Sequence, residues 1–209
     1  MHFASLSAGT RRMRRHALSG GCASLCRENI PEAAMRLFIA IPFSEEVRSV
    51  LLDAQEQLRA QGMRANYSQP GNLHLTLAFL GETDRWEAAR QAMSEIAAAP
   101  FSLTIAGSGR FGNLYWAGVR PCRPLEALAR SLQSALCAHG FAPEQRPFRP
   151  HITLARQASG PSLPRLQIPE TTMEVNGICL MQSERRNGRL TYLPLFEKRL
   201  ALSSGPVSD

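Results

Sequence analysis

The sequence predicts strands and helices arranged in two pseudo-symmetric lobes, with two copies of a short motif facing one cleft. Three observations predict this fold. A pattern of strand, helix and strand occurs twice, the last strand of each copy carries a His-x-Thr motif, and the two motifs lie 77 positions apart. Such an internal repeat implies two similar lobes related by a pseudo-two-fold axis, which would bring the motifs face to face.

The first copy runs from a strand at 36–41 to a strand at 72–80. Pro42 ends the first strand. Ser44 is expected to cap the helix that follows, because a serine hydroxyl accepts a hydrogen bond from a first-turn amide. Apolar residues then continue at helical spacing, and the helix is expected to end near Gly62.

The second copy repeats this order with a strand at 114–119, a helix and a strand at 148–156. Pro124 suits the first turn of the helix, where its missing N–H is not needed. Gly140 suits the position just after the last turn, where a left-handed backbone is common.

Two further segments complete the predicted elements. A helix capped by Asp84 and ended by Pro100 is expected after the first copy, followed by a strand. The segments 173–182 and 189–200 are expected to form a hairpin closed by Asn187-Gly188, a dipeptide that favours a type I′ turn.

The composition is that of a globular domain. The chain has 209 residues, of which 44% are hydrophobic, and a net charge of +7. A basic excess favours acidic partners such as nucleic acid. No apolar run approaches the roughly 18–20 residues of a membrane-spanning helix. The five cysteines include no C-x-x-C pair, so free thiols in a reducing cytoplasm are expected rather than a disulfide framework or a zinc site.

Residues 1–34 differ from the rest of the chain. They contain five arginines, four of them within 11–15, and no amphipathic period. Two interpretations remain open for this segment: a disordered extension, or sequence upstream of a true start at Met35. A single two-lobed domain is expected over 35–202, with a loose tail at 203–209.

The two motifs supply the candidate catalytic residues. Side chains alternate between the faces of a strand, so His74 and Thr76 point the same way, as do His151 and Thr153. Each strand therefore offers one imidazole and one hydroxyl to a common surface. The aliphatic neighbours are expected in the core: Leu75, Leu77, Ile152 and Leu154.

Two imidazoles suit acid–base chemistry, because their pKa lies near neutrality. One would remove a proton while the other donates one, and the hydroxyls would donate to oxygens on which charge develops. Two imidazoles and two hydroxyls could together hydrolyse a phosphodiester without a metal ion. A structural role for the histidines remains the simplest alternative. A metal site is a weaker one, because carboxylate and cysteine ligands are missing from the motifs.

Four residues near the second motif are candidate substrate contacts. Arg156 is a candidate phosphate contact, although strict alternation places it on the face opposite His151, so it needs a β-bulge or the strand's end to reach the cleft. Arg146 and Arg149 are candidate contacts to an RNA backbone. Phe148 could stack on a terminal base or pack in the core. For the arginines, a solvated surface position is the alternative.

The extended motifs resemble a known family. The segments Asn72–Gly81 (NLHLTLAFLG) and Arg146–Arg156 (RPFRPHITLAR), with the opening strand RLFIAI, resemble the two-histidine phosphoesterases. Within that superfamily the chain most resembles the bacterial RNA 2′,3′-cyclic phosphodiesterases, also called 2′-5′ RNA ligases. The resemblance covers about 35–202.

The resemblance implies an α+β fold of two lobes, each a mainly antiparallel sheet with helices outside, and an active-site cleft between the lobes. It also implies hydrolysis of RNA 2′,3′-cyclic phosphate ends to 2′-phosphates, without metal or other cofactor. It implies that His74 is the proton donor to the leaving ribose oxygen and that His151 is the proton acceptor that activates water. The same site could join a 5′-hydroxyl to the cyclic phosphate as a 2′-5′ linkage. RNA ends, tRNA fragments among them, are the expected partners of a cytoplasmic monomer.

Two other functions stay open at this point. The cleft could hold RNA ends or nucleotides without turning them over, as a binding module. It could also act on another small phosphoester, because the loops around the cleft decide the substrate.

Overall fold

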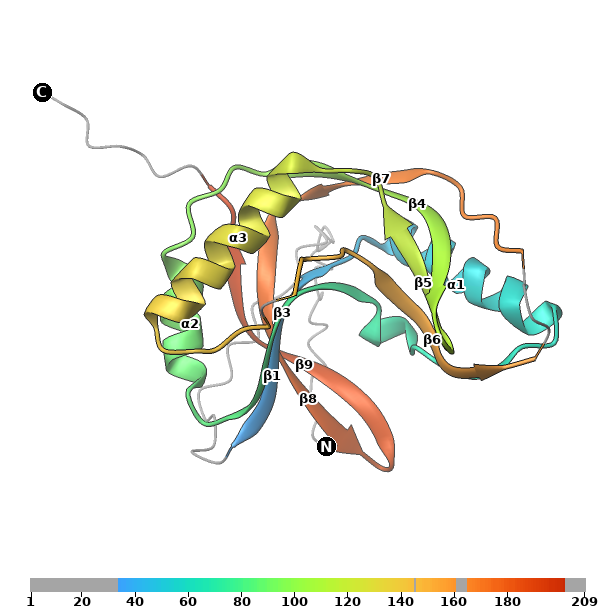
Figure 1. Cartoon of the computed structure of the whole chain (residues 1–209), viewed down its shortest axis with the longest axis horizontal. Helices are drawn as coiled ribbons and strands as arrows, with labels where there is room; N and C mark the ends of the chain where they lie inside the picture. The colour runs from blue at the N-terminus through green and yellow to red at the C-terminus, as the bar shows by residue number, and fades with distance from the viewer. Residues whose placement is uncertain (1–33, 145, 161–164, 202–209) are drawn as a thin grey trace, which may run out of the picture.

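A computed structural model describes residues 34–144, 146–160 and 165–201 (Figure 1). Within these ranges the chain forms two antiparallel sheets, three α-helices and a short 3₁₀ helix. The α+β class and the two antiparallel sheets that the resemblance implies are therefore confirmed. The expectations for 1–33 and for the tail after Leu202 lie outside the described residues. None of the helices in the described ranges is long and apolar enough to cross a bilayer.

One sheet has four strands in the order β3-β1-β8-β9. β1 and β3 come from the first sequence copy, and the C-terminal hairpin completes the sheet. Its strands are β1 (Met35–Pro42), β3 (His74–Thr83), β8 (Gly177–Arg186) and β9 (Arg189–Arg199).

The other sheet has five strands in the order β2-β6-β5-β4-β7. β5 and β6 come from the second sequence copy, and they pair antiparallel as β1 and β3 do. Its strands are β2 (Arg64–Tyr67), β4 (Phe101–Phe111), β5 (Leu114–Val119), β6 (Ile152–Ser159) and β7 (Thr171–Val175).

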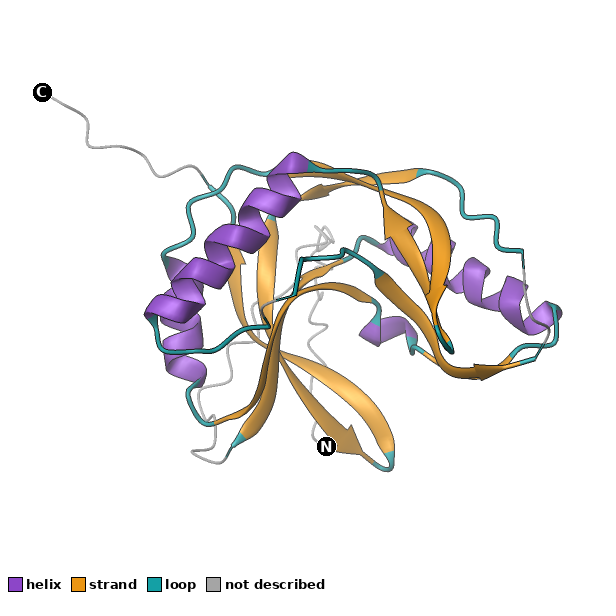
Figure 2. Ribbon diagram, in the orientation of Figure 1, coloured by secondary structure: helices purple, strands orange, loops and turns teal. Residues whose placement is uncertain are grey.

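The helix of each copy packs against the sheet that contains the other copy. α1 contacts β6 and β7, whereas α3 contacts β3 and α2 and also touches β4 in the sheet of its own copy. Figure 2 shows the helices on the outside of the two sheets. Since each helix crosses to the opposite lobe, one continuous apolar core joins the lobes. The helices are α1 (Glu45–Ala60), α2 (Trp86–Ser94) and α3 (Arg123–Ala138), and the 3₁₀ helix η1 is Pro70–Asn72.

Three turn and cap predictions are confirmed. The Ser44 hydroxyl accepts a hydrogen bond from the Val47 amide at 3.3 Å and caps α1. Gly140 has φ +76° just after α3. Asn187 and Gly188 have φ values of 50° and 76°, as a type I′ turn requires, and they close the β8–β9 hairpin.

The boundaries of one helix were predicted wrongly. α2 is not capped by Asp84, because it begins at Trp86 and Thr83 Oγ1 accepts from the Arg85 amide instead. It also ends at Ser94, well before Pro100.

Two strand predictions also need correction. The segment 173–182 is two strands, because β7 pairs with β4 in the five-stranded sheet while β8 pairs with β1 in the other. The strand expected over 148–156 begins only at Ile152. Pro147 and Pro150 have no N–H to give to a ladder, so the approach to the second motif stays irregular.

A β-bulge follows each motif at the same place. The pairing of β3 with β1 shifts between Thr76 and Ala78, and the pairing of β6 with β5 shifts between Thr153 and Ala155. The extra residue, Leu77 or Leu154, resets the alternation of side chains. The repeat therefore extends beyond the sequence motif into the backbone geometry.

Candidate active site

The motif side chains alternate as the sequence predicts. His74 and Thr76 are half-buried, as are His151 and Thr153. Strands β3 and β6 belong to different sheets but contact each other, so the two motifs lie close together. The four aliphatic neighbours are buried: Leu75, Leu77, Ile152 and Leu154.

Both imidazoles are held in the same way. His74 Nδ1 lies 2.7 Å from the carbonyl oxygen of Asn72, and His151 Nδ1 lies 2.8 Å from that of Arg149; each carbonyl is two residues earlier in the chain. A carbonyl only accepts, so Nδ1 must carry the proton that it donates. Each neutral ring therefore has its lone pair on Nε2, which is the nitrogen that can accept a proton.

The surroundings of the two rings differ. His74 Nε2 lies 2.9 Å from Thr76 Oγ1, and its ring packs against Phe38 and Tyr192 with centroid distances of 4.8 and 5.2 Å. His151 meets the edge of Phe111 at a centroid distance of 5.4 Å. Aromatic packing fixes the plane of both rings, and hydrogen bonds at Nδ1 fix their direction.

The environment of His74 favours the neutral imidazole. Burial lowers the pKa of His74 below its ordinary value of 6.5, and the positive charges of Arg156 and His151 lower it further, whereas the bond to the Asn72 carbonyl opposes the shift. Without an anion in the cleft, His74 is therefore neutral at pH 7. A bound phosphate would offset the positive charges and favour its protonation.

Arg156 reaches the face of the sheet that carries the second motif. Its guanidinium lies 3.4 Å from Thr153 Oγ1, and its charge acts on both His74 and Tyr192. The bulge at Leu154 makes this possible, because it reverses the alternation that would otherwise turn Arg156 away. In the first copy the matching position is Phe79, which is 57% exposed, so only one copy supplies a cation.

A cavity of about 940 Å³ lies beside the two motifs, lined by β3, α3 and the loop before His151, whereas His74, Thr153 and Arg156 do not line it. Thr76 and His151 both line it, so it joins one residue from each copy. Three of the candidate contacts line it as well: Arg146, Phe148 and Arg149. Arg146 is also paired with Glu144 at 2.6 Å, and Phe148 packs on the core while bordering the cavity.

Sequence reasoning missed several residues around the histidines. Phe38 and Tyr192 pack on His74, and Phe111 packs on His151. Asn72 holds β9 in place, because its amide donates to the Leu190 carbonyl and accepts from the Tyr192 amide. Phe38 and Tyr192 reach His74 through the strand order β3-β1-β8-β9, and Phe111 reaches His151 from β4 in the other sheet. No local pattern in the sequence signals these contacts. Within the described ranges, no three His, Cys, Asp or Glu side chains are grouped so that they could hold a metal ion.

Gln55 fixes the bulge beside the second motif. This buried amide donates to the Ser68 carbonyl at 2.8 Å and to the Leu154 carbonyl at 2.9 Å. The Ser68 hydroxyl donates to the Thr153 carbonyl at 2.7 Å. Helix α1 and the loop before η1 therefore hold the backbone of the motif on both sides of the extra residue.

We expect Gln55→Leu to lower the free energy of unfolding by about 1–3 kcal/mol, because buried carbonyls lose a hydrogen-bond donor. Urea unfolding monitored by circular dichroism would measure the change. Gln91→Leu is the matched control, since Gln91 is exposed on α2 and should change stability by less than about 0.5 kcal/mol. Equal stability of the two variants would contradict the role of Gln55.

Comparison with known proteins identifies the family. The family model described as the 2′-5′ RNA ligase superfamily matches residues 48–187. A protein of Escherichia coli K12 named RNA 2′,3′-cyclic phosphodiesterase is 35% identical over 180 residues, which are 80% of this chain and 97% of that protein. One of the same name from Thermotoga maritima is 38% identical over 136 residues, 58% of this chain and 70% of that protein. A third, from Geobacillus stearothermophilus, is 35% identical over 132 residues, 59% of this chain and 42% of that protein.

Solved structures agree with the sequence comparisons. Escherichia coli LigT complexed with 3′-AMP superposes with a TM-score of 0.69 at 30% identity, covering 80% of this chain and 98% of LigT. A protein of Thermus thermophilus, TT0787, gives a TM-score of 0.67 at 29% identity, covering 81% of this chain and all of that one, 100%. The family model and the Escherichia coli relative each match the chain over most of its length. This chain belongs to the 2′-5′ RNA ligase superfamily.

Proposed function

We propose that this protein hydrolyses RNA 2′,3′-cyclic phosphate ends to 2′-phosphates, with His74 and His151 as the acid and the base. One observation carries the proposal: two imidazoles are fixed identically through Nδ1, and Thr76 and His151, one residue from each motif, line one cavity. The names of the relatives support the same substrate class.

The proposed step is an in-line displacement at phosphorus. His151 Nε2 accepts a proton from water as the water oxygen attacks, and the bond between phosphorus and the ribose 3′-oxygen breaks. Protonated His74 donates its Nε2 proton to that oxygen, so the product keeps its phosphate on the 2′-oxygen. With each nitrogen about 3 Å from its oxygen, the two Nε2 atoms would lie roughly 6–8 Å apart.

The hydroxyls and the cations would stabilise the charge that develops on the non-bridging oxygens. Thr76 and Thr153 are next to the histidines on the same faces, and Arg156 lies beside Thr153. Because no metal ion is part of this scheme, activity should survive an excess of EDTA. Loss of activity in EDTA and recovery on adding a divalent ion would contradict it.

The pH dependence follows from the lowered pKa of His74. Since one imidazole must be neutral and the other protonated, both kcat and kcat/KM should be bell-shaped, with limbs that belong to the coupled pair. Bound phosphate favours the imidazolium, which raises the pKa of the acid. The alkaline limb of kcat should therefore lie at higher pH than that of kcat/KM. Limbs that coincide, or the opposite order, would contradict this assignment.

The substrate side of the proposal rests on charge. Arg146, Arg149 and Arg156 carry positive charge around the motifs, as suits an RNA end with a few phosphates. We propose that residues 35–202 form one domain and that the protein acts in the cytoplasm as a monomer. The same attack by a 5′-hydroxyl in place of water would form a 2′-5′ linkage.

The direct test is turnover of a short RNA that ends in a 2′,3′-cyclic phosphate, with EDTA present. Chromatography against 2′- and 3′-phosphate standards would identify the product. The proposal expects the 2′-phosphate. A folded protein that binds the RNA end without turnover would instead support the binding-module function. If the protein turned over only a different cyclic phosphoester, that compound and not an RNA end would be its substrate.

A further inference from the structure

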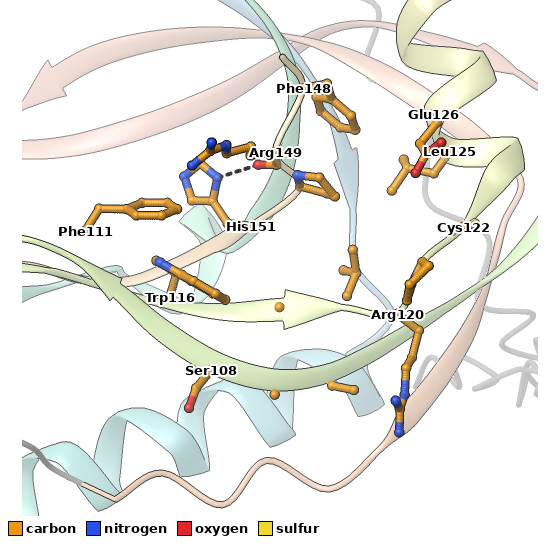
Figure 3. Close-up of a pocket in the computed structure, with 16 residues that line it drawn as sticks. Ser108, Phe111, Trp116, Arg120, Cys122, Leu125, Glu126, Phe148, Arg149 and His151 are labelled. Carbon is orange, nitrogen blue, oxygen red and sulfur yellow. Dashed lines mark hydrogen bonds between the residues drawn. The ribbon is translucent and has the colours of Figure 1, made fainter. Parts of the chain in front are cut away.

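A second cavity adjoins the first on the side of His151. It has a volume of about 600 Å³ and lies between β4, β5 and the start of α3. Figure 3 shows His151 and Trp116 at one end of this space and Cys122 and Leu125 at the other. His151 and Arg149 line both cavities, whereas Thr76 lines only the larger one. The second cavity therefore opens on one catalytic histidine and not on the other motif.

Trp116 provides a flat wall of this cavity, and two glycines make room for it. A Cβ atom at Gly109, its partner across the strands, would lie 2.3 Å from the indole, and one at Gly118 would lie 3.3 Å from it. The ring thus lies directly on the backbone of the sheet, with its other face toward the space. Phe111 supports it, with ring centroids 5.3 Å apart.

The lining combines aromatic and aliphatic surface with a few polar groups. Phe148 and Leu125 add apolar surface, and Arg149 and Glu126 add a charged donor and a charged acceptor. A cavity of this size and lining suits a flat heteroaromatic ring that carries polar edges. Aromatic side chains bind nucleobases in this way, by stacking on the π face that every base has.

We propose that this cavity binds the base of a second nucleotide, the one whose 5′-oxygen lies at His151. This inference rests on the proposed function, because it takes His151 as the group that handles the attacking oxygen. In hydrolysis that position holds water and the cavity plays no part. In a 2′-5′ linkage it holds the 5′-oxygen of the neighbouring nucleoside, whose base then lies against Trp116.

The chemistry balances in both directions. In joining, His151 takes the proton of the 5′-hydroxyl, the 5′-oxygen bonds to phosphorus, the bond to the 3′-oxygen breaks and His74 protonates that oxygen. In cleavage of a 2′-5′ dinucleotide, His74 takes the proton of the 3′-hydroxyl, the 3′-oxygen bonds to phosphorus and the bond to the 5′-oxygen breaks. His151 then protonates the departing 5′-oxygen, and no other reactant is needed.

The test compares two substrates that differ in whether they reach the second cavity. One is adenosine 2′,3′-cyclic phosphate, hydrolysed with water as the only partner, and the other is adenylyl-(2′→5′)-adenosine. Ala106→Leu fills the cavity from β4, and Trp116→Leu removes the stacking face. Ala60→Leu is the matched control, because Ala60 is exposed at the end of α1, away from both cavities. Circular dichroism would confirm folding, and either cavity variant suffices if the other fails to fold.

We expect the ratio of dinucleotide cleavage to cyclic phosphate hydrolysis, each as kcat/KM, to fall about 10- to 100-fold in both cavity variants and to stay unchanged in the control. An unchanged ratio in a folded cavity variant would overturn the inference. So would a wild type that hydrolyses the cyclic phosphate but does not cleave the dinucleotide. A wild type that does not hydrolyse any cyclic phosphate end would overturn the proposed function itself.

Discussion

Replacing His74 or His151 with asparagine should lower kcat on a 2′,3′-cyclic phosphate end by about 10²- to 10⁴-fold in each case. Asparagine keeps a nitrogen that can donate to the carbonyl of Asn72 or Arg149, so the local backbone is preserved while the Nε2 position is lost. The loss therefore reports on proton transfer rather than on folding.

Initial rates under saturating substrate would measure the effect, with His139→Asn as the control. His139 bonds to Glu95 between α3 and α2 and lines neither cavity. That variant should keep nearly full activity. If the two motif histidines act in one step, as proposed, the double variant should be little worse than the more damaged single one. Either single variant retaining more than about a tenth of wild-type kcat would contradict the acid–base pair.

Replacing Thr76 or Thr153 with valine should lower kcat by about 10²- to 10³-fold, or about 2.7–4 kcal/mol of transition-state stabilisation. Valine keeps the shape of threonine and removes only the hydroxyl that would donate to a non-bridging oxygen. The change in KM should be smaller, because the interaction strengthens as charge develops.

The control for this series is Thr104→Val. Thr104 lies on β4 and bonds to the Thr172 hydroxyl at 2.8 Å, and it lines neither cavity. Thr76→Ser and Thr153→Ser should recover much of the activity, since serine restores the donor. Near-normal turnover in both valine variants would rule out the hydroxyls as phosphate donors.

The parts of the fold that the sequence predicts are those governed by local chemistry. Ser44 and Gly140 mark helix ends through their own conformational preferences, and the Asn187-Gly188 turn requires the positive φ values that these two residues tolerate. The repeat predicts that His74 and His151 come from matching strands, because the offset relates whole strand–helix–strand units and not only the motifs.

The parts that could not be predicted depend on contacts between distant segments. The packing of Tyr192 and Phe38 on His74 requires β9 and β1 to enter the same sheet as β3. The position of Arg156 depends on a bulge that Gln55 holds from α1, 99 residues away from Leu154 along the chain. The alternation of the strand alone gives the wrong face for this arginine, and the sequence reveals only that a bulge would be needed.

Two strand boundaries were predicted wrongly, for different reasons. The strand expected over 148–156 begins only at Ile152, because Pro147 and Pro150 have no N–H to donate to a neighbouring strand. The segment 173–182 combines Met173–Val175, where apolar and polar residues alternate, with the apolar run Ile178–Met181, and these two parts belong to strands of different sheets.

The assignment of acid and base is tested most directly with a leaving group that needs no proton. In a 2′,3′-cyclic phosphate with sulfur in place of the bridging 3′-oxygen, the thiolate departs unprotonated, because a thiol is far more acidic than a ribose hydroxyl. The measurement is kcat/KM of His74→Asn and His151→Asn on the oxygen and the sulfur substrates, each relative to wild type. The account predicts that the sulfur substrate restores His74→Asn to near wild-type rates and leaves His151→Asn impaired. Restoration of His151→Asn alone would reverse the roles, and restoration of neither would contradict general acid catalysis at this position.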